Sequence, residues 1–324
     1  FWGIGHPATF SLFVALGIDS FDSASYAIYA YDNRYITLEG TLNIEDLEYL
    51  PCSCQICSKY SLKEIKEDKK LLAMHNLFVC LAEIKTIKQA IKENWLWELV
   101  QQRARANYKL YEALVYLLKK YGKWLEKYEL FSKKSGLQWV GEETIYRPEI
   151  IRAKKLLKRV KSKEYVKIKN LKVPKEIQIV YPFNSLIEKK EEINWKKSIK
   201  KIIDYQFGKN ASKYFKNIEV EVAKTGIARK VYSNNVLVGS IRAYDCFFIP
   251  NLEGAKLITK ALKFPKNRIV IKDEAIPFVS KGYSVFVKFV ENFDKDLKPM
   301  QEVFVVDKND NLIAPGKLIF NVKE

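Results

Sequence analysis

Three cysteines and one histidine form the group of residues with the clearest chemistry in this sequence. Cys52, Cys54 and Cys57 lie within six residues of one another, and His75 follows eighteen residues after the last of them. Thiolates and imidazole favour zinc over metals that prefer oxygen ligands, and three sulfurs with one ring nitrogen complete a tetrahedral site. The set predicts one structural Zn²⁺ with no open position for water, so catalytic chemistry has to lie elsewhere.

The alternative is that these residues are core residues or disulfide partners. A single residue separates Cys52 from Cys54, which makes a disulfide between those two awkward. Cys80 and Cys246 stand alone in apolar surroundings, and we interpret them as small core residues. Because no disulfide framework is evident, the cysteines favour a reducing, cytoplasmic compartment.

Composition adds a charge argument. The 324 residues are 48% hydrophobic and 13% aromatic, enough to build the cores of two or three domains. The net charge of +18 predicts a polyanionic partner, with nucleic acid as the first candidate and an acidic membrane surface as the alternative. The apolar opening is broken by Gly3, Gly5 and Pro7 and has no basic start, so it predicts neither a signal peptide nor a membrane span.

The elements that would hold the metal residues are expected to be mostly helical. The predicted helices span residues 8–17, 71–91, 95–99 and 108–128. In residues 71–91, Leu77, Leu81, Ile84 and Ile91 recur with helical spacing, and this stripe favours core packing over a binding groove. Residues 1–7 and 18–21 are predicted strands, the first ending in a glycine-rich turn, so we expect the chain to open inside a fold.

The middle of the chain is strongly basic and then mixed in character. Residues 154–175 hold ten basic residues and one acidic residue, which indicates a solvated face or linker, or a strip that contacts phosphates. The pattern that follows predicts a helix over residues 195–207. Strands are predicted over residues 177–181, 218–223, 228–231 and 236–241.

The C-terminal seventy or so residues predict a compact β-barrel of short strands. The predicted strands span residues 268–271, 285–290, 302–306 and 312–314. Residues 309–311, Asn-Asp-Asn, predict a hairpin turn, and Pro315 with Gly316 predicts a second break.

Two sets of motifs carry a resemblance to a known family. Ile-Asp-Ser-Phe-Asp-Ser-Ala-Ser-Tyr at 18–26, Pro-Cys-Ser-Cys-Gln-Ile-Cys at 51–57 and His75 resemble the C-terminal half of archaeal tRNA-guanine transglycosylases. Asp-Glu-Ala-Ile-Pro-Phe-Val-Ser-Lys-Gly at 273–282, with the runs at 285–289 and 314–316, resembles the RNA-binding PUA domain that ends those proteins. The family replaces guanine 15 of tRNA with 7-cyano-7-deazaguanine (preQ0) during archaeosine synthesis.

The resemblance implies roles for individual residues. Asp22 would be the nucleophile that forms a covalent ribose intermediate, a step suited to a carboxylate; its alternative is a surface or capping aspartate. Trp2 and Gly3 would form the floor of the base pocket, where an aromatic ring stacks on the base. RNA contacts are expected from Lys281, Gly282 and Lys288, although each is equally suited to ordinary surface.

The resemblance also implies an α/β and α+β multidomain fold. Residues 1–128 would form the C-terminal part of a TIM (β/α)₈ barrel with its zinc knuckle. Residues 129–174 would form a basic connecting segment, 175–253 an α+β domain, and 254–324 the small PUA barrel.

Such a chain would supply only about the last two barrel strands, so the expected partners are tRNA and a separate polypeptide carrying the N-terminal half, which holds a second aspartate. The competing explanation is a truncated sequence. Homodimerisation of the assembled enzyme stays open. The alternative functions are a noncatalytic tRNA-binding subunit and a paralogue of the archaeosine synthase type.

Overall fold

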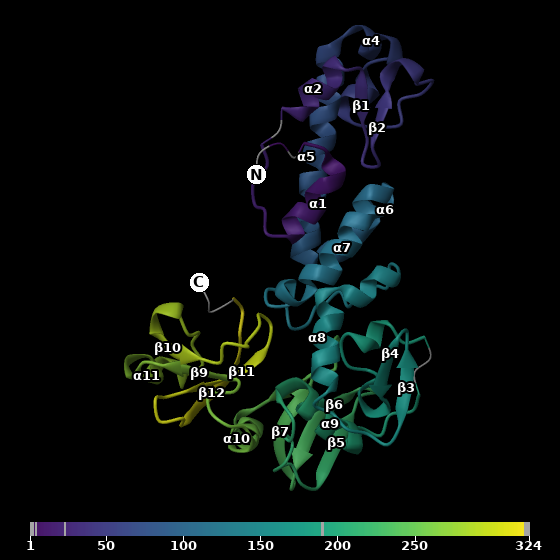
Figure 1. The fold of residues 1–324 in the computed structure, drawn as a ribbon. Helices are drawn as coiled ribbons and strands as arrows, with labels where there is room; N and C mark the ends of the chain where they lie inside the picture. Colours follow the sequence, from purple (N-terminus) through teal and green to yellow (C-terminus); the bar gives the residue numbers. More distant parts are fainter. Residues whose placement is uncertain (1–2, 4, 23, 189–190, 321–324) are drawn as a thin grey trace. The chain divides into compact units, whose positions relative to one another are not determined.

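The computed structural model describes residues 3, 5–22, 24–188 and 191–320 (Figure 1). It divides into two compact units, taken separately below: unit 1 is Phe1–Tyr121 with Val140–Thr144, and unit 2 is Gly122–Trp139 with Ile145–Glu324. Both contain helices and strands, so the fold is mixed α/β as expected. Within the described ranges no helix is long and apolar enough to cross a membrane.

Unit 1 is organised around one long helix, α5 (Lys69–Glu93). It begins where the Asp68 side chain accepts a hydrogen bond from the Lys70 amide at 2.7 Å, and it ends at Asn94 in the left-handed conformation. Six other elements of the unit pack against it: α1 (Pro7–Ala15), α2 (Ser25–Tyr31), α3 (Gln55–Lys59), α4 (Leu62–Glu67), α6 (Leu96–Arg105) and β1 (Arg34–Ile36). The unit also contains β2 (Thr41–Asn43). The helix α7 (Tyr108–Leu125) begins in this unit.

The helix prediction for residues 71–91 is confirmed, but its buried face is not the predicted one. Leu77, Leu81 and Ile91 are exposed, and of the predicted stripe only Ile84 packs against the core. The face that is buried includes polar side chains, which an apolar pattern does not reveal. It consists of Leu72, His75, Asn76, Val79, Cys80, Glu83, Ile87 and Ala90. Each polar member has a hydrogen-bonding partner, which is the condition for burying such a group.

The strand prediction for residues 18–21 is wrong, because this segment is irregular. A strand requires a neighbour that satisfies its backbone groups, and no described segment pairs with it. The predicted strand at residues 1–7 falls partly on residues outside the described ranges. Of the rest, His6 caps α1, where its side chain accepts from the Ala8 amide at 3.2 Å.

Unit 2 begins with a continuous α/β core. The basic segment 129–174, predicted as a connection, contributes helix α8 (Pro148–Leu157) and the hairpin β3 (Tyr165–Ile168) and β4 (Leu171–Pro174) to it. The predicted helix at 195–207 is confirmed as α9 (Trp195–Phe207). An antiparallel sheet and one more helix complete the core: β5 (Ile218–Val222), β6 (Ala228–Ser233), β7 (Val236–Ile241), β8 (Phe248–Pro250) and α10 (Leu252–Ala261).

The strand predicted at residues 177–181 is wrong. This segment forms turns between the 3₁₀ helices Lys175–Ile177 and Phe183–Ser185, and residues 177–183 are all buried. Gln178 gives the run the alternation of a strand, but its side chain is buried too and accepts from the Glu191 amide at 3.1 Å, so exposure does not alternate.

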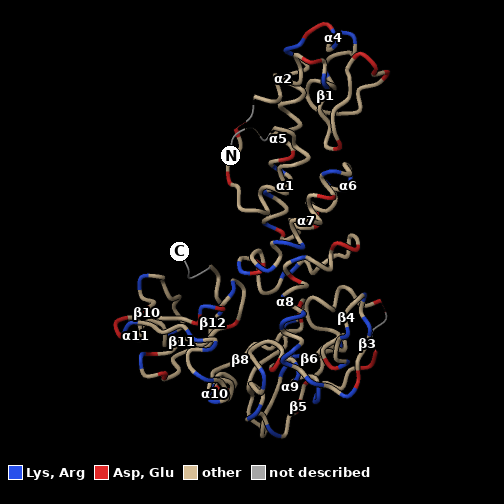
Figure 2. Tube along the Cα trace, in the orientation of Figure 1, with Lys and Arg blue, Asp and Glu red and all other residues tan. Residues whose placement is uncertain are grey.

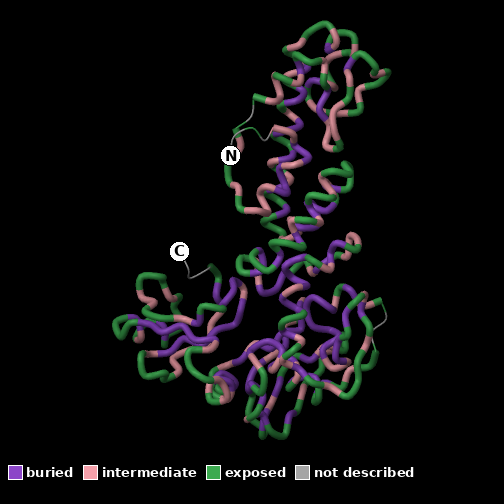
Figure 3. Tube along the Cα trace, viewed as in Figure 1, coloured by how far each residue is buried: buried purple, intermediate pink, exposed green. Residues whose placement is uncertain are grey.

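The C-terminal part of unit 2 is a four-stranded sheet in the order β10-β9-β11-β12, with β9 and β11 parallel. Its strands are β9 (Arg268–Ile271), β10 (Val290–Phe293), β11 (Glu302–Val306) and β12 (Leu312–Lys317). Figure 3 shows the buried strands β9 and β11 in purple. The hairpin turn at 309–311 is confirmed, but Pro315 and Gly316 continue β12 and do not break it.

Two further predictions for this region are not met. Residues 285–289 are irregular with a 3₁₀ turn, because most of them are exposed and pair with no strand. The described strands form open sheets, and neither the expected barrel of unit 1 nor the C-terminal barrel closes within the described ranges. In unit 1 the only described sheet is the β1–β2 hairpin, which cannot form a barrel wall by itself.

Candidate metal centre and nucleophile loop

The predicted metal residues converge on one point in unit 1. The ligand atoms of Cys52, Cys54, Cys57 and His75 all lie within 4.8 Å of one another. His75 Nδ1 is 3.5 Å from Cys54 Sγ and 3.3 Å from Cys57 Sγ. The three cysteines surround the start of the short helix α3, which begins after Cys54, and His75 lies on α5, which packs against α3.

These separations fit a single tetrahedral ion. In a tetrahedral site, metal distances of about 2.3 Å to sulfur and about 2.0 Å to nitrogen place two sulfurs about 3.8 Å apart and a sulfur and a nitrogen about 3.5 Å apart. The nitrogen–sulfur distance of 3.5 Å to Cys54 matches this value, and the distance of 3.3 Å to Cys57 is only slightly shorter. The residues can therefore hold a metal in a closed site of three sulfurs and one nitrogen.

His75 is held in the tautomer that a metal ligand needs. Its Nε2–H donates to the Ile36 carbonyl at 3.0 Å, so the lone pair of Nδ1 faces the sulfurs. Burial lowers the pKa of His75 to about 4, and the hydrogen bond to Ile36 only partly opposes that shift. The imidazole is therefore neutral at pH 7, as metal ligation requires.

Without a metal, the thiolate forms of these cysteines are disfavoured. Burial raises the pKa of Cys57 to about 12, and the neighbouring Cys54 and Cys52 contribute in the same direction. Burial also raises the pKa of Cys52. A bound cation reverses this tendency, because coordination stabilises the thiolate form.

Two side chains outside the ligand set support it. The Tyr35 hydroxyl lies 3.3 Å from Cys57 Sγ, and the Tyr35 ring stacks on the His75 imidazole with centroids 3.7 Å apart. The buried Asn76 accepts from the Ile36 amide at 2.8 Å and donates to the carbonyls of Tyr26 and Arg34 at 3.1 and 3.0 Å. These bonds tie β1 and α2 to α5, so the hairpin that orients His75 is fixed to the helix that carries it.

The predicted nucleophile, Asp22, lies on the exposed loop between α1 and α2. On one side of it the Phe21 ring stacks on Phe10, with centroids 4.6 Å apart. On the other side Ser25, the first residue of α2, donates to the Gly5 carbonyl at 2.7 Å. The carboxylate is thus presented to solvent from a loop that is anchored at both ends.

The other residues predicted to bind the base lie at the start of the chain. Gly3 is exposed and has a φ of +84°, a conformation that favours glycine. The hydrogen bond from Ser25 to the Gly5 carbonyl connects the start of the chain to the start of α2, which directly follows the Asp22 loop. Trp2 lies outside the described residues.

The predicted RNA contacts lie in the exposed segment between β9 and β10. Lys281 and Gly282 are exposed, and Gly282 has a φ of +89°. The Lys288 ammonium lies 4.8 Å from the centroid of the Phe289 ring. Of the three residues, only Gly282 lines the adjoining cavity of about 620 Å³, which is walled mainly by apolar side chains such as Tyr283 and Phe286.

Sequence reasoning missed the supporting residues Tyr35 and Asn76. Tyr35 precedes the cysteines by seventeen residues and gives no spacing signal. Asn76 directly follows the ligand His75 on a helix, and a buried polar neighbour of a ligand is a usable signal for such a role.

Family comparisons match three stretches of the chain. Residues 1–109 match the model described as queuine tRNA-ribosyltransferase. Residues 197–265 match the patch-forming domain C2 of tRNA-guanine transglycosylase, and residues 267–324 match the PUA domain. The first match contains Asp22 and the whole metal cluster.

Relatives named tRNA-guanine(15) transglycosylase align along the whole chain. The protein from Pyrococcus furiosus is 44% identical over 338 residues, covering 100% of this chain and 58% of the relative. Those from Korarchaeum cryptofilum and Methanocaldococcus jannaschii are 41% and 36% identical, and 56% and 62% of their lengths are covered. The chain thus spans a little over half the length of these relatives. The three matched models lie in one order along the chain, and the chain is similar over its whole length to proteins named tRNA-guanine(15) transglycosylase.

Proposed function

We propose that this chain is the C-terminal part of a tRNA-guanine(15) transglycosylase that exchanges guanine 15 for preQ0 on the way to archaeosine. The observation that carries the proposal is the exposed carboxylate of Asp22, on a loop anchored by Phe21 and Ser25 within the region matched by the family model. The printed names of the relatives support the choice of substrate.

The proposed chemistry is a double displacement at ribose C1′. A carboxylate oxygen of Asp22 forms a bond to C1′ while the C1′–N9 bond to guanine breaks, and the departing base takes up a proton at N9. The incoming base then attacks C1′ through its own N9, loses the N9 proton, and releases the Asp22 carboxylate. Base exchange without net hydrolysis requires such an intermediate, because the ribose must be held between the two steps.

The remaining catalytic groups are assigned to a polypeptide that carries the N-terminal half. Under this proposal unit 1 is the last part of a TIM barrel, which that polypeptide completes and to which it adds the second aspartate. Trp2 and Gly3 would contribute the floor of the base pocket. The boundaries at residues 128, 174 and 253 remain proposals.

The metal cluster is assigned a structural role as a zinc site. Its four ligands leave no position for water or substrate, and zinc suits a set of three thiolates and one imidazole. When bound, the ion would join α3 to α5. Its neighbours on α5 also anchor α2, the helix that follows the Asp22 loop.

The C-terminal sheet is assigned to tRNA binding, with Lys281, Gly282 and Lys288 as contacts. A tRNA substrate and five cysteines without disulfides favour the cytoplasm as the compartment.

The test is exchange of labelled guanine into tRNA by the full chain, reconstituted with a candidate N-terminal-half polypeptide identified by co-purification. Asp22→Asn keeps the shape and removes the nucleophile, so exchange should fall by at least about 10³-fold. Asp19→Asn is the matched control, because Asp19 is also exposed on the same loop.

A second readout follows the intermediate directly. Without an incoming base, the wild-type assembly should form a protein–tRNA adduct that survives denaturing electrophoresis, and Asp22→Asn should not. Full exchange by Asp22→Asn would refute the assignment and favour the noncatalytic tRNA-binding alternative. Full exchange by the isolated chain would refute the need for a partner.

A further inference from the structure

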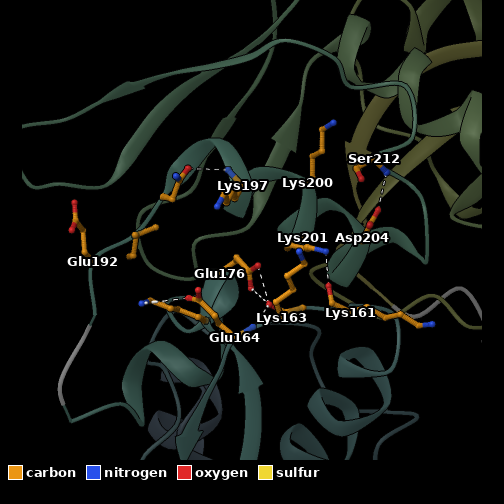
Figure 4. A pocket seen from close by; sticks show the side chains of 14 residues that line it. Lys161, Lys163, Glu164, Glu176, Glu192, Lys197, Lys200, Lys201, Asp204 and Ser212 are labelled. Carbon is orange, nitrogen blue, oxygen red and sulfur yellow. Dashed lines mark hydrogen bonds and ion pairs between the residues drawn. The ribbon is translucent and has the colours of Figure 1, made fainter.

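Unit 2 contains a groove of about 1110 Å³ that neither the metal centre nor the Asp22 loop explains. One wall is α9, which contributes Lys197, Lys200 and Lys201 (Figure 4). The facing segment between α8 and β3 contributes Lys161 and Lys163. The blue segments around α9 in Figure 2 mark the same concentration of positive charge.

The groove has an excess of cations that the protein does not neutralise. Six lysines and four carboxylates line it. Lys175 pairs with Glu164 at 3.6 Å and with Glu191 at 2.8 Å, so its charge is already compensated. By contrast, Lys161, Lys163, Lys197 and Lys200 form no ion pair within the described ranges.

The carboxylates of the groove are partly committed to internal hydrogen bonds. Glu176 accepts from the Ser162 hydroxyl at 2.7 and 2.9 Å, and Asp204 accepts from the Ser212 amide at 2.8 Å. The Lys201 ammonium donates to the Lys161 carbonyl, a bond that joins α9 to the facing segment. These contacts hold the walls together and leave Lys163, Lys197 and Lys200 facing solvent.

The groove suits an extended polymer better than a small ligand. Small-molecule pockets are mostly apolar and enclose their ligand with a few fixed polar groups. Here the free cations are long, exposed side chains on two facing segments, an arrangement that can follow a chain of phosphates. A flat lipid surface cannot enter a concave groove, whereas a nucleic acid strand can.

We propose that this groove is a second RNA-binding site, in which the lysines of α9 and of the 161–163 segment contact the phosphodiester backbone of the tRNA substrate. This inference rests on the proposed function for its substrate. The carboxylates in the walls are consistent with RNA, because an RNA strand also presents 2′-hydroxyl and base N–H donors. The basic run found in the sequence thus gains a specific role at its 161–163 portion.

The experiment measures binding of a tRNA transcript to the full chain by fluorescence anisotropy between 50 and 200 mM salt. Lys197→Glu/Lys200→Glu changes two groove residues. The matched control, Lys196→Glu/Lys209→Glu, makes the same charge change at exposed positions on and just after α9 that do not line the groove. Lys197→Gln/Lys200→Gln removes the charges without reversing them, and circular dichroism checks that each variant is folded.

Loss of two phosphate contacts should reduce the slope of log K against log salt by about 1.4 to 1.8 and weaken binding about tenfold at 150 mM salt. The control should keep the wild-type slope. Equal losses in groove and control variants, or no loss in either, would overturn the proposal. So would loss of binding to phosphatidylserine vesicles with tRNA binding intact, since that result indicates a membrane site.

The outcomes also separate this inference from the function on which it rests. If the wild-type chain binds no tRNA, both fail. If the groove variants bind tRNA normally while Asp22→Asn abolishes exchange, only the groove assignment fails.

Discussion

Asn76 offers the sharpest test of how unit 1 is held together. Its side chain is fully buried and makes three hydrogen bonds, one to the Ile36 amide and two to the carbonyls of Tyr26 and Arg34. Asn76→Leu keeps a similar volume but leaves three backbone groups without a partner. Each such group costs about 1 to 2 kcal/mol, and the greater hydrophobicity of leucine returns about 1 kcal/mol. The expected loss is therefore about 2 to 5 kcal/mol.

Amide hydrogen exchange followed by mass spectrometry measures this loss locally, so unit 2 does not obscure it. Peptides covering residues 34–36 should exchange about 30- to 3000-fold faster in Asn76→Leu, at about 1.4 kcal/mol per factor of ten. Gln89→Leu is the control, because Gln89 is exposed on the same helix and its side chain donates to the nearby Glu93 on that helix. A change in Asn76→Leu below about fivefold, or one equal to the control, would refute the claim that Asn76 fixes β1 to α5.

Three further outcomes are expected. In the metal-free chain, unit 1 should lose stability as the pH falls from 6.5 to about 4. The pKa of His75 is lowered to about 4 in the folded state, so the unfolded state binds the proton first as the pH falls. Urea titrations across this range measure the free energy of unfolding, and a rise in that energy at lower pH would contradict the prediction. Tyr35→Phe keeps the stacking on His75 but removes the hydroxyl near Cys57, so zinc affinity in chelator competition should fall about 10-fold or more; unchanged affinity would exclude a supporting role. In Gly254→Ala the new Cβ would lie 2.0 Å from the Val238 carbonyl oxygen, so unit 2 should lose about 1 to 3 kcal/mol, and a melting temperature equal to wild type would show that the backbone relaxes freely.

The sequence pattern predicted a feature correctly where the residues that determine it lie close together in the chain. The cysteine spacing with His75 predicted the metal cluster, because ligand identity and short separation are properties of the sequence itself. The helix at 195–207 and the strand at 236–241 were predicted with the bounds that the structure has, since each has a clear period and polar or turn residues at its ends.

Local pattern failed where a distant segment decides the outcome. The exposed Leu77 and Leu81 match a helical stripe as well as the buried face does, but α5 buries the side that α2 and β1 cover, with His75 and Asn76 on it. The segment 285–289 has strand-forming residues and no neighbour to pair with.

The sequence by itself determined the family resemblance, the metal ligand set, the candidate nucleophile and the excess of positive charge, because these depend on residue types in a fixed order. Only the tertiary structure decided which nitrogen of His75 faces the sulfurs, how the Asp22 loop is anchored, and that Lys161 and Lys163 face the lysines of α9 across one groove. These features arise from hydrogen bonds and packing between segments that are distant in sequence, and no local period records such contacts.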